Sequence, residues 1–462
     1  MIKFIALLPL FVLSGCAVGP DYQQPVSQLP DDWQQPVADT GYLDTWWGQF
    51  GDAELTAYIE ESLAHNNDLK VAIANADIAA AALRQSRSAL YPGVNLALDA
   101  TRNKNSGNAS FPLPTSPDTE FRGGLEVVNY EFDIWGRIRR ANEAAMADLA
   151  ADTAVMHGVR SSLAASVAQV YFQALALDRQ LALLTRLHET RTDNEQLQKL
   201  RLDSGLISPY DYEQARSETA AVAAQLPVLR ESRRQALTAL AVLRGVTPEA
   251  MFAGWVSPQD LSAFALPEAP PVPMDLPSDM LARRPDVIAA EQRLIAANAR
   301  IGVAKAGYFP RLSVGGFFGG LSTSFDTLDA EGSRSWNAAV ATSMPLTRLR
   351  EIGAQVDSAT AATEAAAASY AGTVQLAFQE TLNALGLVAS TAEVRAAQQD
   401  RVAALENAYR ISTARYDVGR IGYLELLDVE RQLRQVEQEQ VEAQLAQLQA
   451  TVDLYRALGG GW

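Results

Sequence analysis

Alternation of apolar and polar residues predicts four strands. After Pro92, the residues Val94, Leu96 and Leu98 alternate with polar neighbours, which is typical of a strand with one apolar face. Three further alternating stretches are Phe121 to Phe132, Arg311 to Leu321 and Trp336 to Met344. Each covers about ten residues, the length that a tilted strand needs to cross a bilayer. The same pattern also fits two ordinary hairpins in water.

Two long stretches carry an unbroken helical pattern, from Arg137 to about Asp203 and from about Leu349 to Asp417. No proline occurs between Pro117 and Pro209, and apolar residues recur at mixed spacings of three and four. About 67 residues at about 1.5 Å each would form a rod on the order of 100 Å long. These stretches favour a coiled-coil-like arrangement over a globular core.

The chain is an internal duplication, most evident where two helical patterns meet at Gly419 and Gly422. Glycine accepts the backbone angles that end a helix, so this point is expected to be a helix-turn-helix tip. An offset of 214 residues aligns Arg201, Gly205 and Ile207 with Arg415, Gly419 and Ile421. Upstream, the Ala-rich stretch Asp68 to Pro92 returns as Asp286 to Pro310. Each half is therefore expected to carry one long helical hairpin.

This duplication suggests a division of the chain. We expect a signal peptide at 1–15, a tether at 16–50, a first repeat at 51–247, a Pro-rich connector at 248–278 and a second repeat at 279–462. Each repeat would comprise a helix, two strands and a helical hairpin. The first of these helices is predicted from near Asp52 to about Leu90.

The N-terminus indicates export and lipidation. The apolar run from Phe4 to Leu13 is too short to span a bilayer and is typical of a secretory signal. Next come Leu13-Ser14-Gly15-Cys16, which resemble the lipobox of bacterial lipoproteins, so Cys16 is expected to carry fatty acids such as palmitate. Ala17 stands where an inner-membrane retention signal has Asp, which implies the outer membrane. The alternative is a soluble exported protein with one stray thiol.

Composition narrows the function further. The chain has 462 residues, is 48% hydrophobic and has a formal charge of −16, so neither disorder nor nucleic-acid binding is expected. An acidic surface or lumen that favours cations fits better. The histidines, His65, His157 and His188, lie at scattered positions without a second ligand at metal spacing. We expect no catalytic site, no metal and no cofactor, and the chain is not predicted to be an enzyme.

Four strands cannot close a sheet by themselves. An open sheet edge in lipid leaves backbone groups without partners, and the smallest membrane barrels use about eight strands. The chain is therefore expected either to oligomerise or to keep its strands in water.

Several short motifs in this order resemble the outer-membrane efflux lipoproteins of the TolC family, OprM branch. They are the lipobox with AVGPDYQQP, Tyr130 to Arg140 (YEFDIWGRIRR), Arg284-Pro285-Asp286, Tyr423-Leu424 with Leu427-Asp428, and the terminal ALGGGW. The resemblance covers nearly the whole mature chain. One departure is Met344 to Arg350, where the family often shows an aromatic residue and Gly-Arg.

The resemblance implies an α+β membrane protein. Three chains with four strands each would form one transmembrane β-barrel, continued by a long antiparallel α-helical barrel in the periplasm. The homotrimer would be the exit duct of a tripartite efflux pump that expels drugs or other small toxic compounds. Its implied partners are outer-membrane lipid, a periplasmic adaptor protein and an inner-membrane RND-type pump.

The resemblance also assigns roles at the tips. Leu424, Glu425 and Asp428 match the family's periplasmic gate, where threefold symmetry would stack rings of leucines and carboxylates. The alternative is that acids in a first helical turn only complement the helix dipole, worth under about 1 kcal/mol. The first repeat has Tyr210, Asp211 and Gln214 at these places, so the second is expected to dominate the constriction. The turn residues, Gly205, Ile207, Gly419 and Ile421, are expected to contact the adaptor.

Three other functions stay open at this point. A type I secretion exit duct would share the fold. A periplasmic adaptor would also be an exported coiled-coil protein, but it would carry only one hairpin. A structural lipoprotein rod would need no amphipathic strands, and channel conductance would separate it from a duct.

Overall fold

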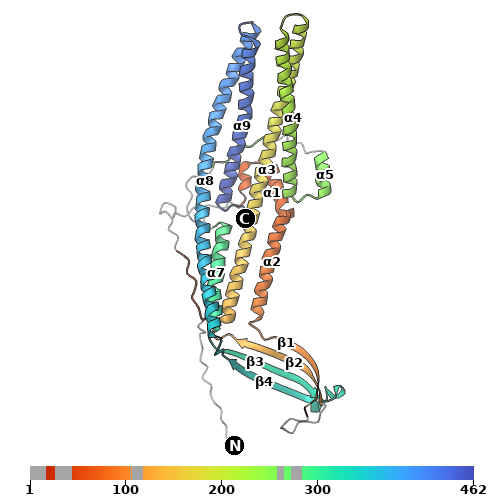
Figure 1. Ribbon diagram of the computed structural model, residues 1–462, viewed down its shortest axis with the longest axis vertical. Helices are drawn as coiled ribbons and strands as arrows, with labels where there is room; N and C mark the ends of the chain where they lie inside the picture. The colour runs from red at the N-terminus through yellow and green to blue at the C-terminus, as the bar shows by residue number, and fades with distance from the viewer. Residues whose placement is uncertain are drawn as a thin grey trace. The chain divides into compact units, whose positions relative to one another are not determined.

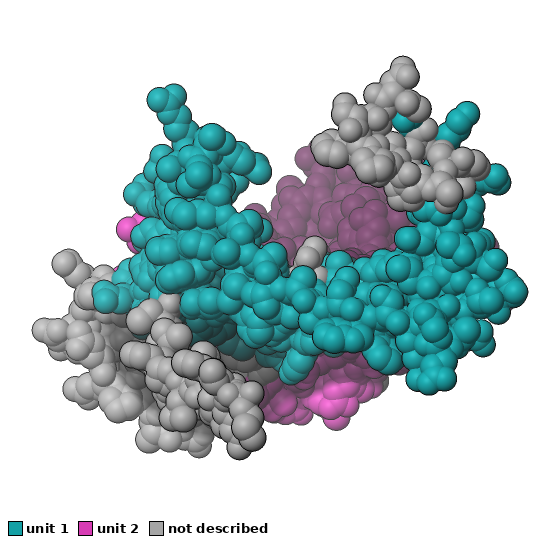
Figure 2. All heavy atoms as spheres, turned by 90° about the horizontal axis from the view of Figure 1, so that it is seen from below, with its two compact units in different colours: residues 1–26, 75–152, 289–371 teal, residues 27–74, 153–288, 372–462 magenta. Residues whose placement is uncertain are grey.

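The computed structural model describes residues 17–25, 44–104, 106, 118–256, 265–271 and 283–461. The predicted signal peptide, Cys16 and most of the tether lie outside the described residues. The chain divides into two compact units, coloured separately in Figure 2. Unit 1 comprises residues 1–26, 75–152 and 289–371, and unit 2 comprises residues 27–74, 153–288 and 372–462. Each unit therefore takes residues from both sequence repeats.

The four predicted strands are confirmed and form one antiparallel sheet in unit 1, in the order β1-β2-β3-β4 (Figure 1). The strands are β1 (Val94–Asn103), β2 (Asp118–Phe132), β3 (Arg311–Ser322) and β4 (Arg334–Ser343). Between β3 and β4 the chain makes two short 3-10 turns, η4 (Phe325–Thr327) and η5 (Glu331–Ser333). The outer edges of β1 and β4 have no partner strand among the described residues.

The sheet has two chemically different faces, because successive side chains on a strand point to opposite sides. The register places Leu96 opposite Leu125, Leu125 opposite Phe318, and Phe318 opposite Trp336. We call this the apolar face; its large exposed side chains are Val94, Leu96, Leu98, Leu125, Phe318, Trp336 and Val340. The opposite side, called the polar face, carries Asn95, Asp99, Glu120, Arg122, Glu126 and Asn337, together with Phe317.

Strand β2 passes directly into helix α3 (Arg137–Asp203). Asp133 accepts hydrogen bonds from the backbone N–H groups of Ile138 and Arg139, both at 2.9 Å, and so satisfies donors at the helix start. Trp135 stacks on Phe309 with ring centroids 4.6 Å apart. The corresponding junction in the second half runs from Ser343 at the end of β4 to helix α8 (Leu349–Asp417).

Small side chains line the contact between α3 and α7 (Pro285–Ala306) in unit 1. Ala144 and Ala147 of α3 are buried against Ala296 and Ala299 of α7. Alanine lets two helix backbones approach closely and costs little conformational entropy on folding. The Ala-rich composition of these stretches is thereby explained.

Both predicted hairpins are present in unit 2, and Figure 1 shows the helices of each running side by side in opposite directions. Helix α3 returns as α4 (Pro209–Leu243), and α8 returns as α9 (Tyr423–Ala457). The long helices α3 and α8 have 67 and 69 residues, and the expectation of two long helical rods is confirmed. The main core of this unit includes Trp46, Tyr171, Phe172, Leu448, Val452 and Tyr455.

The predicted single helix from Asp52 to about Leu90 is wrong. The structure has α1 (Ala53–His65) and α2 (Asn67–Ser88), separated by Asn66 in an extended conformation. The side-chain oxygen of Asn66 accepts from the N–H of Leu69 at 3.0 Å and caps α2. Its amide nitrogen donates to the carbonyl of Leu243 at 3.0 Å, a partner that the local sequence does not reveal.

The Pro-rich connector begins with a short helix, α5 (Pro248–Val256). Residues 265–271 lie against the second hairpin, where Gln444 donates to the carbonyls of Leu266 and Pro267 at 3.2 Å. Arg395 of α8 pairs with Glu268 at 2.6 Å. Across the described part of the chain, none of the helices has a stretch both long and apolar enough to cross a bilayer.

Candidate functional site

The two hairpin turns have nearly the same backbone. Gly205 and Gly419 adopt left-handed conformations with φ of 70° and 72°. Just after each glycine, a backbone N–H closes the turn: Leu206 donates to Arg201 at 2.8 Å and Arg420 donates to Arg415 at 2.9 Å. This bond pattern ends a helix at a left-handed residue, a conformation that glycine adopts without strain.

The helices that return from these turns start differently. Ser208 caps α4 in a capping box, in which its side chain accepts from the N–H of Asp211 while the Asp211 carboxylate accepts from the N–H of Ser208. Gly422 takes the place of Ser208 at the start of α9, and it offers no side chain for a cap. Asp211 in the first repeat is therefore committed to its helix start, whereas Glu425, its counterpart in the second repeat, has no such hydroxyl partner.

The predicted gate residues occupy the exposed side of the first two turns of α9. Leu424 is 52% exposed, and Glu425 and Asp428 are also exposed. The carboxylate of Asp428 accepts from the Gln432 amide at 2.8 Å, one turn further along the helix. Leu427, in contrast, points into the unit and is fully buried. An exposed leucine beside two carboxylates leaves both apolar and negative groups available to another chain or to a passing solute.

Two tyrosines join the hairpins close to the tips. Arg201 of α3 donates to the Tyr416 hydroxyl at 2.9 Å, and Asn194 of α3 donates to the Tyr423 hydroxyl at 2.5 Å. Burial raises the pKa of Tyr423 above its ordinary value, and the charge of Arg191 and the Asn194 hydrogen bond oppose that shift only in part. Tyr423 therefore stays neutral and serves as a hydrogen-bonding contact between the two hairpins.

A buried ion pair lies one to two turns further from the tip. Arg191 of α3 is 3.2 Å from Glu430 of α9, and their side chains are only 4% and 9% exposed. Arg191 Nε and Glu430 Oε1 are buried, and neither atom has a hydrogen-bond partner among the residues that the structure describes. Such a pair makes the contact between the hairpins sensitive to substitution, since removing one partner would leave the other as an isolated buried charge.

Neither residue of this pair belongs to a sequence motif, and only a comparison of the two repeats marks the position of Arg191. The offset of 214 aligns Glu430 with Arg216 and Arg191 with Leu405. Arg191 carried the available signal, since it is charged at a helical position that is apolar in the other repeat, whereas Glu430 aligns with another charged residue.

Further along unit 2 the duplication produces two helix joints, where the end of one helix meets the start of another. At joint 1, Asn66 links the last carbonyl of α4, that of Leu243, to the start of α2. At joint 2, Arg284 donates to the carbonyl of Ala457 at the end of α9, at 3.0 Å. Sequence alignment of the repeats pairs Asn66 with Arg284, so the same linking position is neutral in one joint and charged in the other.

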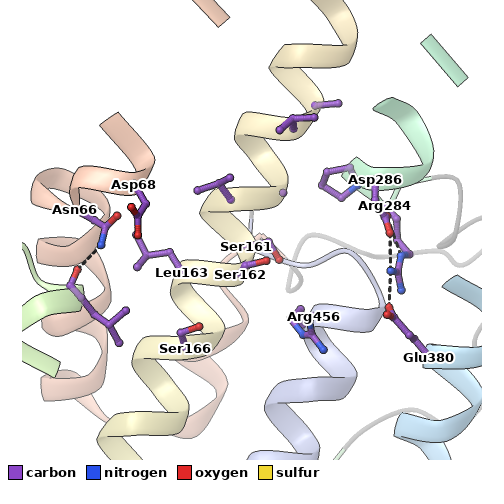
Figure 3. A pocket seen from close by; sticks show the side chains of 16 residues that line it. Asn66, Asp68, Ser161, Ser162, Leu163, Ser166, Arg284, Asp286, Glu380 and Arg456 are labelled. Atoms are coloured by element: carbon purple, nitrogen blue, oxygen red, sulfur yellow. Dashed lines mark hydrogen bonds and ion pairs between the residues drawn. The ribbon is translucent and has the colours of Figure 1, made fainter. Parts of the chain in front are cut away.

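Joint 2 also reaches α8. The guanidinium of Arg284 contacts the carboxylates of Asp286 at 2.8 Å and Glu380 at 2.6 Å (Figure 3). Burial alone would raise the pKa of Asp286, but the hydrogen bond and charge of Arg284 outweigh it and lower that pKa below its ordinary value. The carboxylate is therefore ionised at neutral pH, and the joint is held by opposite charges.

A cavity of about 550 Å³, lined by both apolar and polar side chains, lies beside both joints. Figure 3 shows Asn66 and Asp68 on one side of the α3 serines Ser161, Ser162 and Ser166, and Arg284, Asp286 and Glu380 on the other. Of its charged side chains, Arg284 pairs with Asp286 and Glu380, and Arg456 lies 3.8 Å from Asp453. Among the described residues, no group of three or more His, Cys, Asp or Glu side chains is placed to hold a metal ion.

Comparison with known proteins identifies relatives along nearly the whole chain. A family model described as outer membrane efflux protein matches residues 58–246 and 276–460. The toluene efflux pump outer membrane protein TtgC of Pseudomonas putida is 32% identical over 460 residues, covering 98% of this chain and 94% of that protein. The pyoverdine export outer membrane protein OpmQ of Pseudomonas putida is 33% identical over 474 residues, covering 100% and 98%. The solved structure of the outer-membrane channel OprN is 30% identical with a TM-score of 0.85, covering 97% of this chain and 100% of that chain.

Proposed function

The chain belongs to the outer membrane efflux protein family, and from this we propose that it is the outer-membrane exit duct of a tripartite efflux pump. The family consists of efflux channel proteins rather than enzymes, so the chain needs no catalytic group. The observation that carries the proposal is the fold, a sheet with one apolar face joined to two long helical hairpins, shared with OprN over 97% of the chain. Its location is the outer membrane, with the hairpins extending into the periplasm.

The duct is a homotrimer. Both sheet edges are without a partner strand in the described chain. An open edge in lipid is unfavourable, because each backbone group that has no hydrogen-bond partner there costs several kcal/mol. Three copies would pair β4 of one with β1 of the next and close 12 strands. The apolar face would then contact lipid and the polar face would line the duct.

The second-repeat tip is the periplasmic gate. Leu424, Glu425 and Asp428 are exposed on one helix, and threefold symmetry would bring three copies of each around the axis. The leucines narrow the pore, and the carboxylates attract cations. In the first repeat the acidic residue Asp211 already caps its own helix, which supports the second repeat as the main constriction.

The turns at the tips contact a periplasmic adaptor, which joins the duct to an inner-membrane RND-type pump. Gly205 and Gly419 shape the two turns, and Ile207 and Ile421 lie next to them, half buried. The neighbouring Leu206 and Val418 are exposed apolar side chains at the end of each hairpin, suited to an apolar contact with another chain.

Cys16 carries the lipid anchor. It lies outside the described residues, but the residues that follow it are fixed in unit 1. The N–H of Val18 donates to the carbonyl of Trp135 at 3.0 Å, and Asp21 pairs with Arg140 at 2.7 Å. The described residues that follow the acylation site are therefore held at the junction of β2 and α3. Mass spectrometry should find an acylated peptide beginning at Cys16, and an unmodified thiol there would refute the anchor.

Two measurements on the purified chain test the duct. Light scattering in detergent should report the mass of a trimer, and planar bilayers should show conductance. Deleting the gene should raise sensitivity to solvents or antibiotics, the kinds of compound that the names of the relatives mention. A monomer that conducts as the only species would refute closure by three chains, and loss of protein secretion without any change in drug sensitivity would favour a type I secretion duct.

A further inference from the structure

Arg122 lies on the polar face of the sheet among acidic neighbours. Its Nη1 atom is 3.6 Å from the carboxylate of Asp99, which stands opposite it on β1. Its Nη2 atom donates to Glu126 at 3.0 Å, four residues further along β2. Its guanidinium carbon is 4.0 Å from the centre of the Phe317 ring on β3. Groups on three adjacent strands therefore hold this one cation.

A pair of glycines makes this arrangement possible. Gly124 lies between Arg122 and Glu126 on the same face and pairs with Gly319 across the strands. A methyl group placed on Gly319 would come within 2.8 Å of the Phe317 ring. The ring therefore packs directly on the backbone of Gly319. Phe317 is only 6% exposed beneath the guanidinium. A cation over an aromatic ring is held more strongly where water is excluded, so the charge of Arg122 has a fixed position.

We propose that Arg122 determines charge selectivity in the sheet-lined part of the duct, an inference that rests on the proposed trimeric channel. The polar face around it carries the carboxylates Asp99, Glu120 and Glu126. Without the guanidinium these carboxylates would form an acidic belt, which favours cations and repels anions. Three fixed arginines, one from each chain, partly neutralise the carboxylates of that belt and so weaken its preference for cations over anions.

The competing explanation is that Arg122 only covers Phe317 and holds the strands together. Lysine and glutamine separate the two roles. Lysine keeps the positive charge but lacks the planar group that stacks on a ring and bridges two carboxylates, whereas glutamine removes the charge. If the charge matters, Arg122→Lys will behave like the parent in ion selectivity. If only the packing matters, Arg122→Lys and Arg122→Gln will have the same ion selectivity.

The test is the reversal potential of the full chain in planar bilayers under a KCl gradient. Salt should be kept below about 0.1 M, where the screening length exceeds about 10 Å. We expect Arg122→Gln to shift the reversal potential toward that of K⁺. One charge acting across about 10 Å of water changes the free energy of each ion by about 0.4 kcal/mol, about twofold in favour of K⁺ and about twofold against Cl⁻, so the K⁺ to Cl⁻ permeability ratio should rise about fourfold. Glu126→Gln should shift it in the opposite direction. Both shifts should disappear at about 1 M salt.

Arg334→Gln is the matched control, because Arg334 lies opposite Gly320 on the apolar face. It removes the same charge from the other side of the sheet and should leave the reversal potential unchanged. A conducting Arg122→Gln trimer with the parent's reversal potential would overturn the inference, and so would an Arg122→Lys variant that shifts as far as Arg122→Gln. If the unaltered parent chain does not conduct, that result would instead refute the proposed channel on which the inference depends.

Discussion

Breaking the buried ion pair between Arg191 and Glu430 should loosen the contact between the two hairpins. The side chains are 4% and 9% exposed, so Glu430→Gln would leave the guanidinium buried without its counter-charge. Removing one partner of a buried pair typically costs about 3–5 kcal/mol. The double variant Arg191→Met with Glu430→Leu should cost far less, because apolar groups of similar size replace both charges.

Hydrogen exchange of backbone amides measures this effect locally. A loss of about 3 kcal/mol corresponds to about 150-fold faster exchange, and we expect it in α3 and α9 around the pair rather than in the sheet. The matched control is Glu213→Gln, which breaks the ion pair with Arg216 on the surface, where the side chains are 62% and 60% exposed. That change should cost under about 1 kcal/mol.

Two results would refute the reasoning. One is an amide exchange rate in Glu430→Gln equal to that of the parent. It would mean that water or a movement of the side chain stabilises the Arg191 guanidinium after its counter-charge is removed. The other is a double variant that exchanges as fast as the single one, which would mean that the lost volume and not the stranded charge is responsible.

Three further outcomes are expected. Replacing Leu424 and Asp428 by alanine should leave the trimer intact but raise its conductance and weaken block by divalent cations; a double variant no leakier than the parent would place the gate elsewhere. Gly245→Ala should lower the melting temperature more than Gly205→Ala, since both glycines have φ near 70° but only at Gly245 would the new methyl group lie 2.4 Å from a backbone oxygen. Because the pKa of Asp286 is lowered in the folded chain, its contribution to stability is complete above the unfolded value of about 3.9 and is lost as pH falls through the folded value; acid should therefore lower the amide protection factors at joint 2, relative to the intrinsic exchange rate at each pH, in the parent but not in Asp286→Asn.

The regular elements were predictable because their signal is local. Period-two alternation identified all four strands, and the absence of proline identified α3 and α8 to within a few residues. Left-handed glycines at the tips followed from the same kind of local reasoning, since Gly205 and Gly419 interrupt otherwise continuous helical patterns.

The features that the sequence did not reveal depend on partners far away in the chain. Asn66 looks like one more polar residue in an Ala-rich helix, and only the carbonyl of Leu243, 177 residues away, makes a helix break favourable there. Arg191 and Glu430 look like ordinary surface residues of long helices until α3 and α9 are packed together. Pairwise electrostatics of this kind has no periodicity, so pattern analysis of a single helix could not detect it.

The helix joints have a consequence for the reach of the hairpins. Helix α4 ends where α2 begins, and α9 ends where α7 begins, so the returning helix of each hairpin finishes at a fixed contact. Inserting seven residues in each arm would lengthen a hairpin by about 10 Å while preserving the faces that pack together. The linking residues Asn66 and Arg284 would keep their partners unchanged. A fold built in this way could be matched to cell envelopes of different width without redesign of its core.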